Sequence, residues 1–100
     1  MSLNIAQRRA TRAEFAKNVE LLGLTPADVA AALGVDGARI EDIMALRRVR
    51  RLEDAWVLRA FLLDRANRSG VELVPFSALR GNPEDYPFLD AERIQDRLLD

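Results

Sequence analysis

The chain has 100 residues, 49% of them hydrophobic and 31% charged, which suits one globular domain with a modest core and is too little for two. Its formal net charge is −1, so any attraction to nucleic acid has to come from local clusters of basic residues. The absence of cysteine and histidine excludes disulfides and thiolate zinc sites and removes the commonest general base. No apolar run is long enough to span a bilayer and there is no signal-peptide pattern, so we expect a cytoplasmic protein.

The N-terminal part of the chain predicts two helices. Asn4, followed by a glutamine in the capping-box position, predicts a short helix over residues 2–10. Thr11 with Glu14 repeats this signature and predicts a second helix over residues 11–22. The apolar face of the second helix carries Phe15, Val19 and Leu22.

Residues 25–44 predict two short helices joined by a tight turn. Thr25 is a good N-cap and Pro26 suits the first helical position, where a missing N–H has no consequence. Gly34 is placed to end this helix in the left-handed conformation, and Asp36 is placed to cap the next one. The inward positions of the pair are Val29, Ala30, Leu33, Val35, Ile40, Ile43 and Met44.

A long helix is predicted over residues 52–67, and it is apolar nearly all round. A helix of this kind is buried on more than one side. The preceding helix pair can cover one side, and the C-terminal segment or a second subunit has to cover the other. The aromatic residues are expected to be core rather than a binding surface, with some available for a dimer interface. They are Trp56, Phe61, Phe76, Tyr86 and Phe88.

Residues 71–89 are punctuated by proline and glycine yet rich in apolar side chains, so we expect them to wrap the long helix. Residues 71–74 suit an extended stretch, and residues 76–79 suit one helical turn. Asp90 then caps a final helix over residues 91–99.

The sequence gives catalysis little support. The carboxylates of Glu84, Asp85 and Asp90 are close enough in sequence for an acid pair or a Mg²⁺ site. Their setting among prolines and caps favours solvated loop charges instead. There is no glycine-rich phosphate loop and no nucleophile motif, so we expect no enzyme, no cofactor and no metal.

The stretch from residue 25 to 44 resembles the lambda-repressor-like (XRE-type) helix-turn-helix. The resemblance is carried by the small residue Ala30, the turn residue Gly34 and the core positions, and it extends over residues 11–66. These core positions are Val29, Leu33, Val35, Ile40 and Ile43. The whole pattern, including SLN near the N-terminus, EDAW and VPFSALRG, also resembles a small bacterial family of uncharacterised proteins. The prediction is therefore a single all-α domain over residues 1–100 with four to six helices. Residues 11–66 form its helix-turn-helix core, and residues 67–100 form a C-terminal wrap and final helix.

The helix-turn-helix resemblance implies binding to double-stranded DNA, with the second helix of the pair in the major groove. At its N-terminal end and outer face, Arg39, Gly37 and Ala38 are the residues expected at base edges. The basic connector that follows is expected at phosphates through Arg47, Arg48, Arg50 and Arg51. A second basic group consists of Arg8, Arg9 and Arg12. It would also contact DNA phosphates if it lies on the same side of the domain as the connector arginines. A homodimer would supply the half-site symmetry that such readers use.

The charge pattern also supports a different reading. Asp36, Glu41 and Asp42 make the outer face of the second helix acidic, and phosphates repel carboxylates. The connector arginines also have nearby ion-pair partners in Glu41, Asp42, Glu53 and Asp54. The first hypothesis is a small DNA-binding transcriptional regulator. The alternative is a protein–protein interaction module that keeps the fold without binding DNA, and a third is a small-molecule sensor with a pocket between the long helix and the C-terminal wrap.

Overall fold

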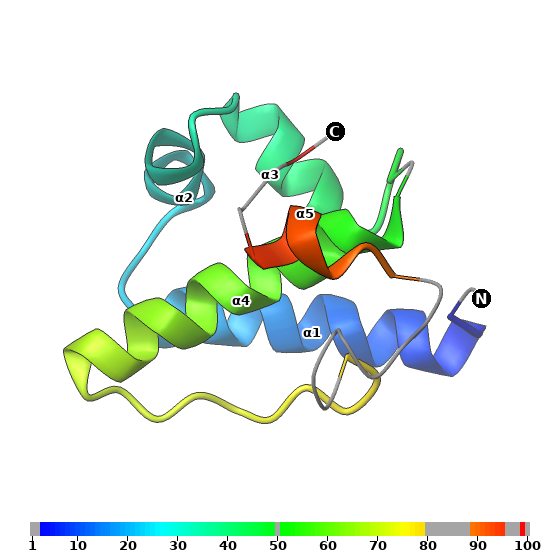
Figure 1. Ribbon diagram of the computed structural model, residues 1–100. Coiled ribbons are helices and arrows are strands. Elements are labelled where there is room, and N and C mark those ends of the chain that lie inside the picture. Colours follow the sequence, from blue (N-terminus) through cyan, green and yellow to red (C-terminus); the bar gives the residue numbers. More distant parts are fainter. Residues whose placement is uncertain (1–2, 50, 80–88, 96–98, 100) are drawn as a thin grey trace.

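The computed structural model describes residues 3–49, 51–79, 89–95 and 99. These residues form five helices and no strand, which confirms the prediction of an all-α fold with four to six helices (Figure 1). Within this described part, no helix combines the length and the apolar composition needed to cross a membrane. The helices are α1 (Ile5–Leu21), α2 (Pro26–Leu33), α3 (Gly37–Met44), α4 (Leu52–Ser69) and α5 (Ala91–Gln95).

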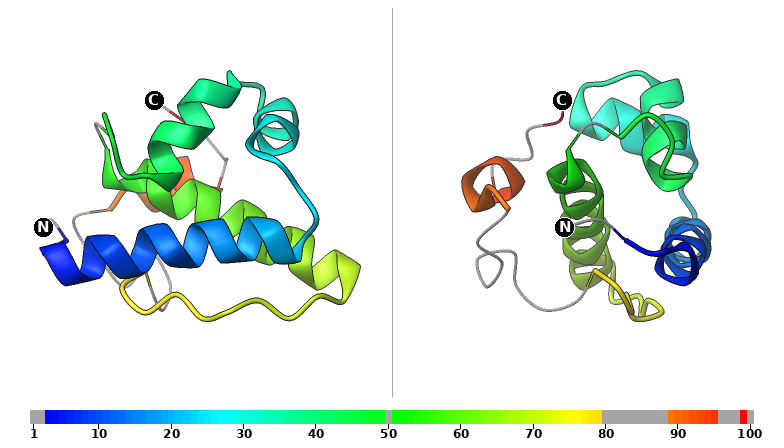
Figure 2. Two further views of the ribbon diagram at one scale, coloured as in Figure 1. Left: turned by 180° about the vertical axis from the view of Figure 1, so that it is seen from behind. Right: turned by 90° about the vertical axis from the view of Figure 1, so that its right-hand side faces the viewer.

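Helix α4 is the centre of the fold. It lies between α1 on one side and α5 on the other, and α3 contacts both α1 and α4 (Figure 2). The predicted burial of this helix on more than one side is therefore confirmed, and its second side is covered by α5 of the same chain. Its buried apolar side chains are Ala55, Trp56, Val57, Leu58, Leu62 and Ala66.

The two helices predicted before residue 23 are one helix, α1, so that prediction was wrong. Asn4 and Gln7 form the predicted capping box at its start. Thr11 caps nothing: it lies fully buried inside the helix, and its hydroxyl donates to the carbonyl of Gln7 at 2.8 Å. A threonine hydroxyl can bond the preceding turn in this way, and no residue between 5 and 21 breaks a helix.

The signals at both ends of α2 are confirmed. The Thr25 hydroxyl accepts from the backbone N–H of Asp28, and the Asp28 carboxylate accepts from the N–H of Thr25. Gly34 ends the helix in the left-handed region at φ 72°. Asp36 occupies the N-cap position of α3, but its side chain makes no capping hydrogen bond.

Residues 71–76 are extended, and the helical turn predicted over residues 76–79 does not form. The segment runs back along α1 (Figure 2, left) and is bonded to it by buried Asn18. The Asn18 side-chain amide donates to the carbonyl of Val74 at 3.1 Å and accepts from its N–H at 2.8 Å. These bonds satisfy the Val74 backbone, which explains why it needs neither a helix nor a strand partner.

The C-terminal part rests on α4. Asp90 caps α5 as predicted, because its carboxylate accepts from the N–H of Arg93. The buried carboxylate of Glu53 on α4 accepts from the N–H of Asp90 at 2.7 Å. Ile94 is buried against the core as expected. Residues 96–98 of the predicted helix and the expected core positions Tyr86 and Phe88 lie outside the described residues, and Leu99, its predicted last residue, is not helical.

Candidate nucleic-acid interface

Helices α2 and α3 form a compact pair that leaves one side of α3 open. The left-handed Gly34 turns the chain, and the N–H of Val35 then bonds the carbonyl of Ala30 at 3.0 Å. Ile40 and Ile43 of α3 are fully buried, whereas Ala38 and Glu41 on its outer side are exposed. The outer side of α3 is therefore accessible to a partner.

Gly37 begins α3 where it approaches α2. A Cβ atom added to Gly37 would lie 3.8 Å from the Cα atom of Ala27, which is an ordinary contact. Gly37 is half-buried, while the next residue, Ala38, is exposed. Of these two residues predicted at base edges, only Ala38 is exposed.

Arg39 is directed into the molecule rather than outward. Its Nη2 atom lies 2.5 Å from Oδ2 of Asp54 on α4, in both a hydrogen bond and an ion pair. The Asp54 side chain is 0% exposed and the Arg39 side chain 20% exposed. A buried carboxylate is costly without a cationic partner, so this ion pair fixes α3 against α4.

Among the described residues of the connector between α3 and α4, two are in the left-handed region. They are Leu46 at φ 56° and Arg48 at φ 53°, neither of which is glycine. Leu46 is buried, and its carbonyl accepts from Nη2 of Arg8 at 2.8 Å. Left-handed backbone at L-residues persists only where the surroundings hold it, and here the buried side chain and Arg8 do so.

Arg47, Arg48 and Arg51 of the connector are exposed. Arg47 and Arg48 lie next to buried Leu46, and Arg51 occupies the N-cap position of α4. Arg47 makes one long ion pair with Asp42, at 3.7 Å between Nε and Oδ1, and its side chain is 67% exposed. Such an exposed pair contributes between about 0 and 1 kcal/mol and opens readily. The predicted contact residue Arg50 lies outside the described residues.

Two arginines of the second basic group, Arg8 and Arg12 on α1, lie beside the start of the connector. Arg8 reaches the connector through the carbonyl of Leu46, and Arg12, one turn further along α1, lines a shallow groove of about 340 Å³. The same groove is lined by Glu41, Met44 and Ala45 at the end of α3. Arg8 and Arg12 therefore lie beside the C-terminal end of α3, close to Arg47.

Of the ion pairs suggested for the connector arginines, the pair of Arg47 with Asp42 is present. Asp54 pairs with Arg39 instead, and Glu53 accepts from the backbone of Asp90. Among the described residues Glu41 makes no ion pair, so its exposed carboxylate remains on the outer side of α3.

The spacing of residues within α3 did not predict that the Arg39 side chain points into the molecule. A usable signal was present in α4: its composition is apolar nearly all round, so acids such as Asp54 near its start have to be buried and need a cation. The contact of Arg8 with the connector had no sequence signal, because the two residues are far apart in the chain and the acceptor is a backbone carbonyl.

No cluster with metal-binding composition occurs in the described ranges. Asp90 acts as a helix cap, as described above, while Glu84 and Asp85 lie outside these ranges.

Comparison with known proteins gives one family. Residues 1–90 match the model of a family described as "Uncharacterized protein conserved in bacteria (DUF2316)". No curated protein and no solved structure matches the chain. Because the match covers nearly the whole chain, the protein belongs to this bacterial family.

Proposed function

We propose that this protein is a small helix-turn-helix DNA-binding regulator of the lambda-repressor-like type that holds double-stranded DNA mainly through its phosphates. The observation that carries the proposal is the meeting of two arginine groups, from α1 and from the connector, beside the C-terminal end of α3. Arginine is suited to this role because its guanidinium binds phosphate oxygens through several N–H donors. The proposed phosphate contacts are Arg8, Arg12, Arg47, Arg48 and Arg51.

Sequence discrimination by this surface is expected to be weak. Arg39, which the sequence placed at base edges, is held by Asp54 on α4, so its proposed role is to fix the angle of α3. The outer side of α3 then offers the small Ala38 and the carboxylate of Glu41. A glutamate can accept from the amino group of cytosine, but it gains nothing from the phosphates around it.

A two-fold dimer remains part of the proposal. Two copies related by symmetry would place two α3 helices on successive turns of the duplex. The described surface supplies large exposed apolar side chains at Ile5, Leu21 and Leu63. Sedimentation of the free protein and of its DNA complex tests the stoichiometry directly.

The direct test is a fluorescence anisotropy titration of a labelled random-sequence duplex, at roughly 50 mM and again at roughly 200 mM salt. We expect binding in the micromolar range or tighter at low salt, with a steep loss at high salt. The double variant Arg47→Gln/Arg48→Gln should bind more weakly at low salt. The matched control is Arg68→Gln, which removes an equally exposed charge near the far end of α4. Absence of binding at about 10 μM protein in low salt contradicts the proposal.

The role of Arg39 is tested separately. The double variant Arg39→Met/Asp54→Leu removes both charges of the pair and keeps its volume apolar. If Arg39 only positions α3, this variant keeps its DNA affinity across a panel of duplex sequences. Loss of a sequence preference shown by the unchanged protein would place Arg39 at the bases after all.

One observation favours a second function. The inward direction of Arg39 leaves the exposed α3 surface with the carboxylates of Asp36 and Glu41, which suits a basic protein partner better than DNA. In this alternative the fold is a protein–protein interaction module. A partner that binds the unchanged protein, but not the variant Asp36→Asn/Glu41→Gln, would support it, provided that the anisotropy titration shows no DNA binding.

A further inference from the structure

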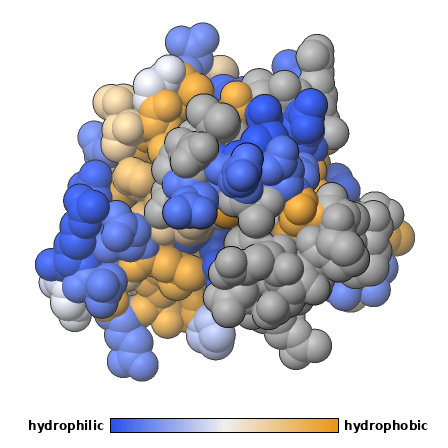
Figure 3. Space-filling view, in the orientation of Figure 1, coloured by the Kyte–Doolittle hydropathy of each residue, from blue (hydrophilic) through white to orange (hydrophobic). Residues whose placement is uncertain are grey.

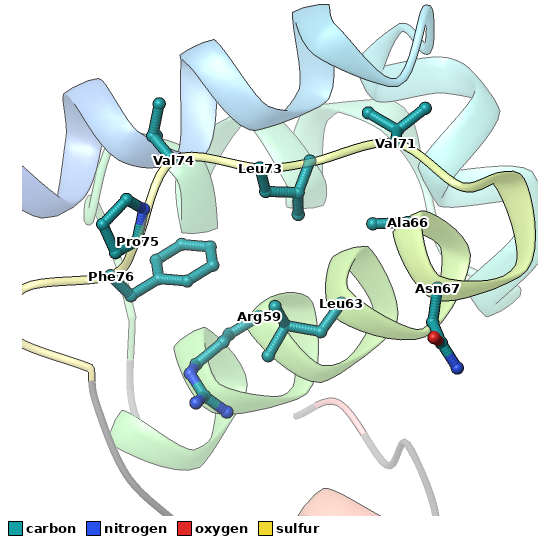
Figure 4. A pocket seen from close by; sticks show the side chains of 9 residues that line it. All are labelled: Arg59, Leu63, Ala66, Asn67, Val71, Leu73, Val74, Pro75 and Phe76. Carbon is teal, nitrogen blue, oxygen red and sulfur yellow. The ribbon is translucent and has the colours of Figure 1, made fainter.

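A cleft lies between α4 and the extended segment over residues 71–76, and neither of the proposed functions uses it (Figure 4). Its volume is about 450 Å³, within the range of small-molecule sites. Figure 3 shows an apolar area on the face seen in Figure 1, in the region between α4 and this segment. The cleft is separate from the candidate nucleic-acid interface, because α3 lies at the top of Figure 1 and the segment at the bottom.

The segment that forms the outer wall of the cleft is anchored at both ends. At its start, the N–H of Val71 bonds the carbonyl of Ala66 on α4 at 3.1 Å. Toward its end, Val74 is bonded to Asn18 of α1, as described above, and the hydroxyl of the following Ser77 donates to a carboxylate on α1 at 2.7 Å. Because these bonds hold the segment in place without a ligand, the cleft is preformed.

The side chains that face the space between the two walls are apolar. Leu73 and Phe76 point from the segment toward α4, where Leu63 and Ala66 lie (Figure 4). Leu63 is 38% exposed, although a leucine beside three other apolar side chains would be covered in a filled core. An apolar molecule that removed this surface from water would gain free energy in proportion to the area buried.

The polar side chains of the lining, Arg59 and Asn67, do not favour a charged ligand. Both extend away from the segment in Figure 4. The guanidinium carbon of Arg59 lies 4.9 Å from the ring centroid of Trp56 and 5.9 Å from that of Phe76, so this cation already has partners. None of the lining residues carries a carboxylate that could hold a cationic ligand. A charged ligand would therefore lose hydration in the cleft without gaining a partner for its charge.

We propose that this cleft binds a small, uncharged and mainly apolar organic molecule. Its apolar body lies between Leu63 on α4 and Leu73 on the segment, and burial of apolar surface supplies the affinity. Each CH₂ group buried in this way strengthens binding by about fourfold. The proposal concerns the protein without DNA, so it does not depend on the DNA-binding function.

Four probes test the class of ligand in titrations of the unchanged protein by calorimetry. They are 1-octanol, the shorter 1-hexanol, and two charged molecules with the same chain length as octanol, octanoate and octylammonium. Octanol should bind saturably with one molecule per chain, and hexanol should bind about tenfold more weakly because it lacks two CH₂ groups. Octanoate and octylammonium should each bind more weakly than octanol by about tenfold or more.

A matched pair of leucine variants locates the site. Leu63→Gln should weaken octanol binding by about tenfold, because it replaces an apolar part of the α4 wall with an amide. Leu21→Gln is the control, since Leu21 is also 38% exposed but lies on α1 and is not part of the lining, and it should leave octanol binding unchanged.

A second variant covers the case in which circular dichroism shows that Leu63→Gln does not fold. Leu73→Ala shortens the apolar side chain of the opposite wall and should also weaken octanol binding by about tenfold. Three outcomes would overturn the proposal: no saturable binding of octanol, a charged probe that binds as tightly as octanol, or equal octanol affinities in the folded cleft variant and Leu21→Gln.

Discussion

The guanidinium of Arg39 on α3 lies 2.5 Å from the fully buried carboxylate of Asp54 on α4. This ion pair joins the helix that carries the candidate interface to the helix at the centre of the fold. It also removes from the outer surface the only basic residue of α3. The Arg39–Asp54 ion pair therefore both holds α3 in position on the core and leaves the outer surface of α3 without a basic side chain.

Breaking this pair on one side should be strongly destabilising. Arg39→Met should lower the free energy of unfolding by about 3 kcal/mol, because it removes the cationic partner of a buried carboxylate. The double variant Arg39→Met/Asp54→Leu should regain most of that loss. Urea unfolding followed by circular dichroism measures both. A loss below about 1 kcal/mol in the single variant would mean that the pair behaves like a surface ion pair.

The salt dependence of DNA binding should show the phosphate contact of each connector arginine separately. Each of Arg47→Gln and Arg48→Gln should reduce the slope of the logarithm of the binding constant against the logarithm of salt concentration by about 1. The reduction should be the same for different duplex sequences, because phosphate contacts carry no sequence information. Arg68→Gln should leave the slope unchanged, and an equal effect there would argue for unspecific attraction.

Stability and DNA binding should move in opposite directions at Arg48. Its φ of 53° costs an L-residue about 1–2 kcal/mol, whereas glycine adopts it freely and loses about 0.5–1 kcal/mol in backbone entropy. Arg48→Gly should therefore raise the free energy of unfolding by about 0.5 kcal/mol while weakening DNA binding.

Arg47→Gly is the matched control for this prediction. Arg47 does not have a positive φ, so glycine there should lower stability by about 0.5–1 kcal/mol. Thermal unfolding of both variants, at the same pH and salt concentration, tests whether Arg48→Gly raises stability and Arg47→Gly lowers it. Destabilisation by Arg48→Gly would mean that the left-handed connector is held without strain.

Asn18 should hold the extended segment in place. Asn18→Ala should lower the free energy of unfolding by about 2 kcal/mol, because it leaves the N–H and the carbonyl of Val74 without their bonds. It should also speed amide hydrogen exchange at Val74 more than at the buried amides of α4. Asn67→Ala, an exposed asparagine at the other wall of the cleft, should change stability by less than about 0.5 kcal/mol.

Two glycines of the α2–α3 pair should respond differently to alanine. Gly34→Ala should cost about 1 kcal/mol although nothing lies within 4 Å of the added Cβ atom, since the left-handed φ of 72° alone opposes it. Gly37→Ala should be within about 0.5 kcal/mol of neutral, because Gly37 has no left-handed φ and its nearest new contact is at 3.8 Å. Chemical unfolding of the two variants side by side gives the comparison.

Local signals in the sequence predicted the helices well where they depended on a single turn of chain. The N-cap at Thr25 and the left-handed Gly34 were both placed correctly, because capping and left-handed backbone depend on the residue itself. The same kind of signal was misleading at Thr11. Its hydroxyl donates to the carbonyl of Gln7 in the preceding turn of α1 and does not cap a second helix. This became clear only from the structure, in which α1 is continuous through Thr11.

The candidate interface was predicted less completely. The exposure of Arg47, Arg48 and Arg51 followed from their place in a charged connector. The direction of Arg39 did not, because a residue three positions into a helix can point either way until the neighbouring element is known. The meeting of Arg8 with the connector depended likewise on the packing of α1 beside the end of α3.

The sequence by itself therefore determined the all-helical fold class, the turn at Gly34 and the burial of α4 on more than one side. These features arise from hydrophobic periodicity and from the conformational preferences of single residues, which act within a few positions of the chain. Only the tertiary structure decided that Arg39 pairs with Asp54, that the two arginine groups meet, and that an apolar cleft remains beside α4. Those features require charges and surfaces that are distant in the chain to be brought together, and no local preference specifies which of them will meet.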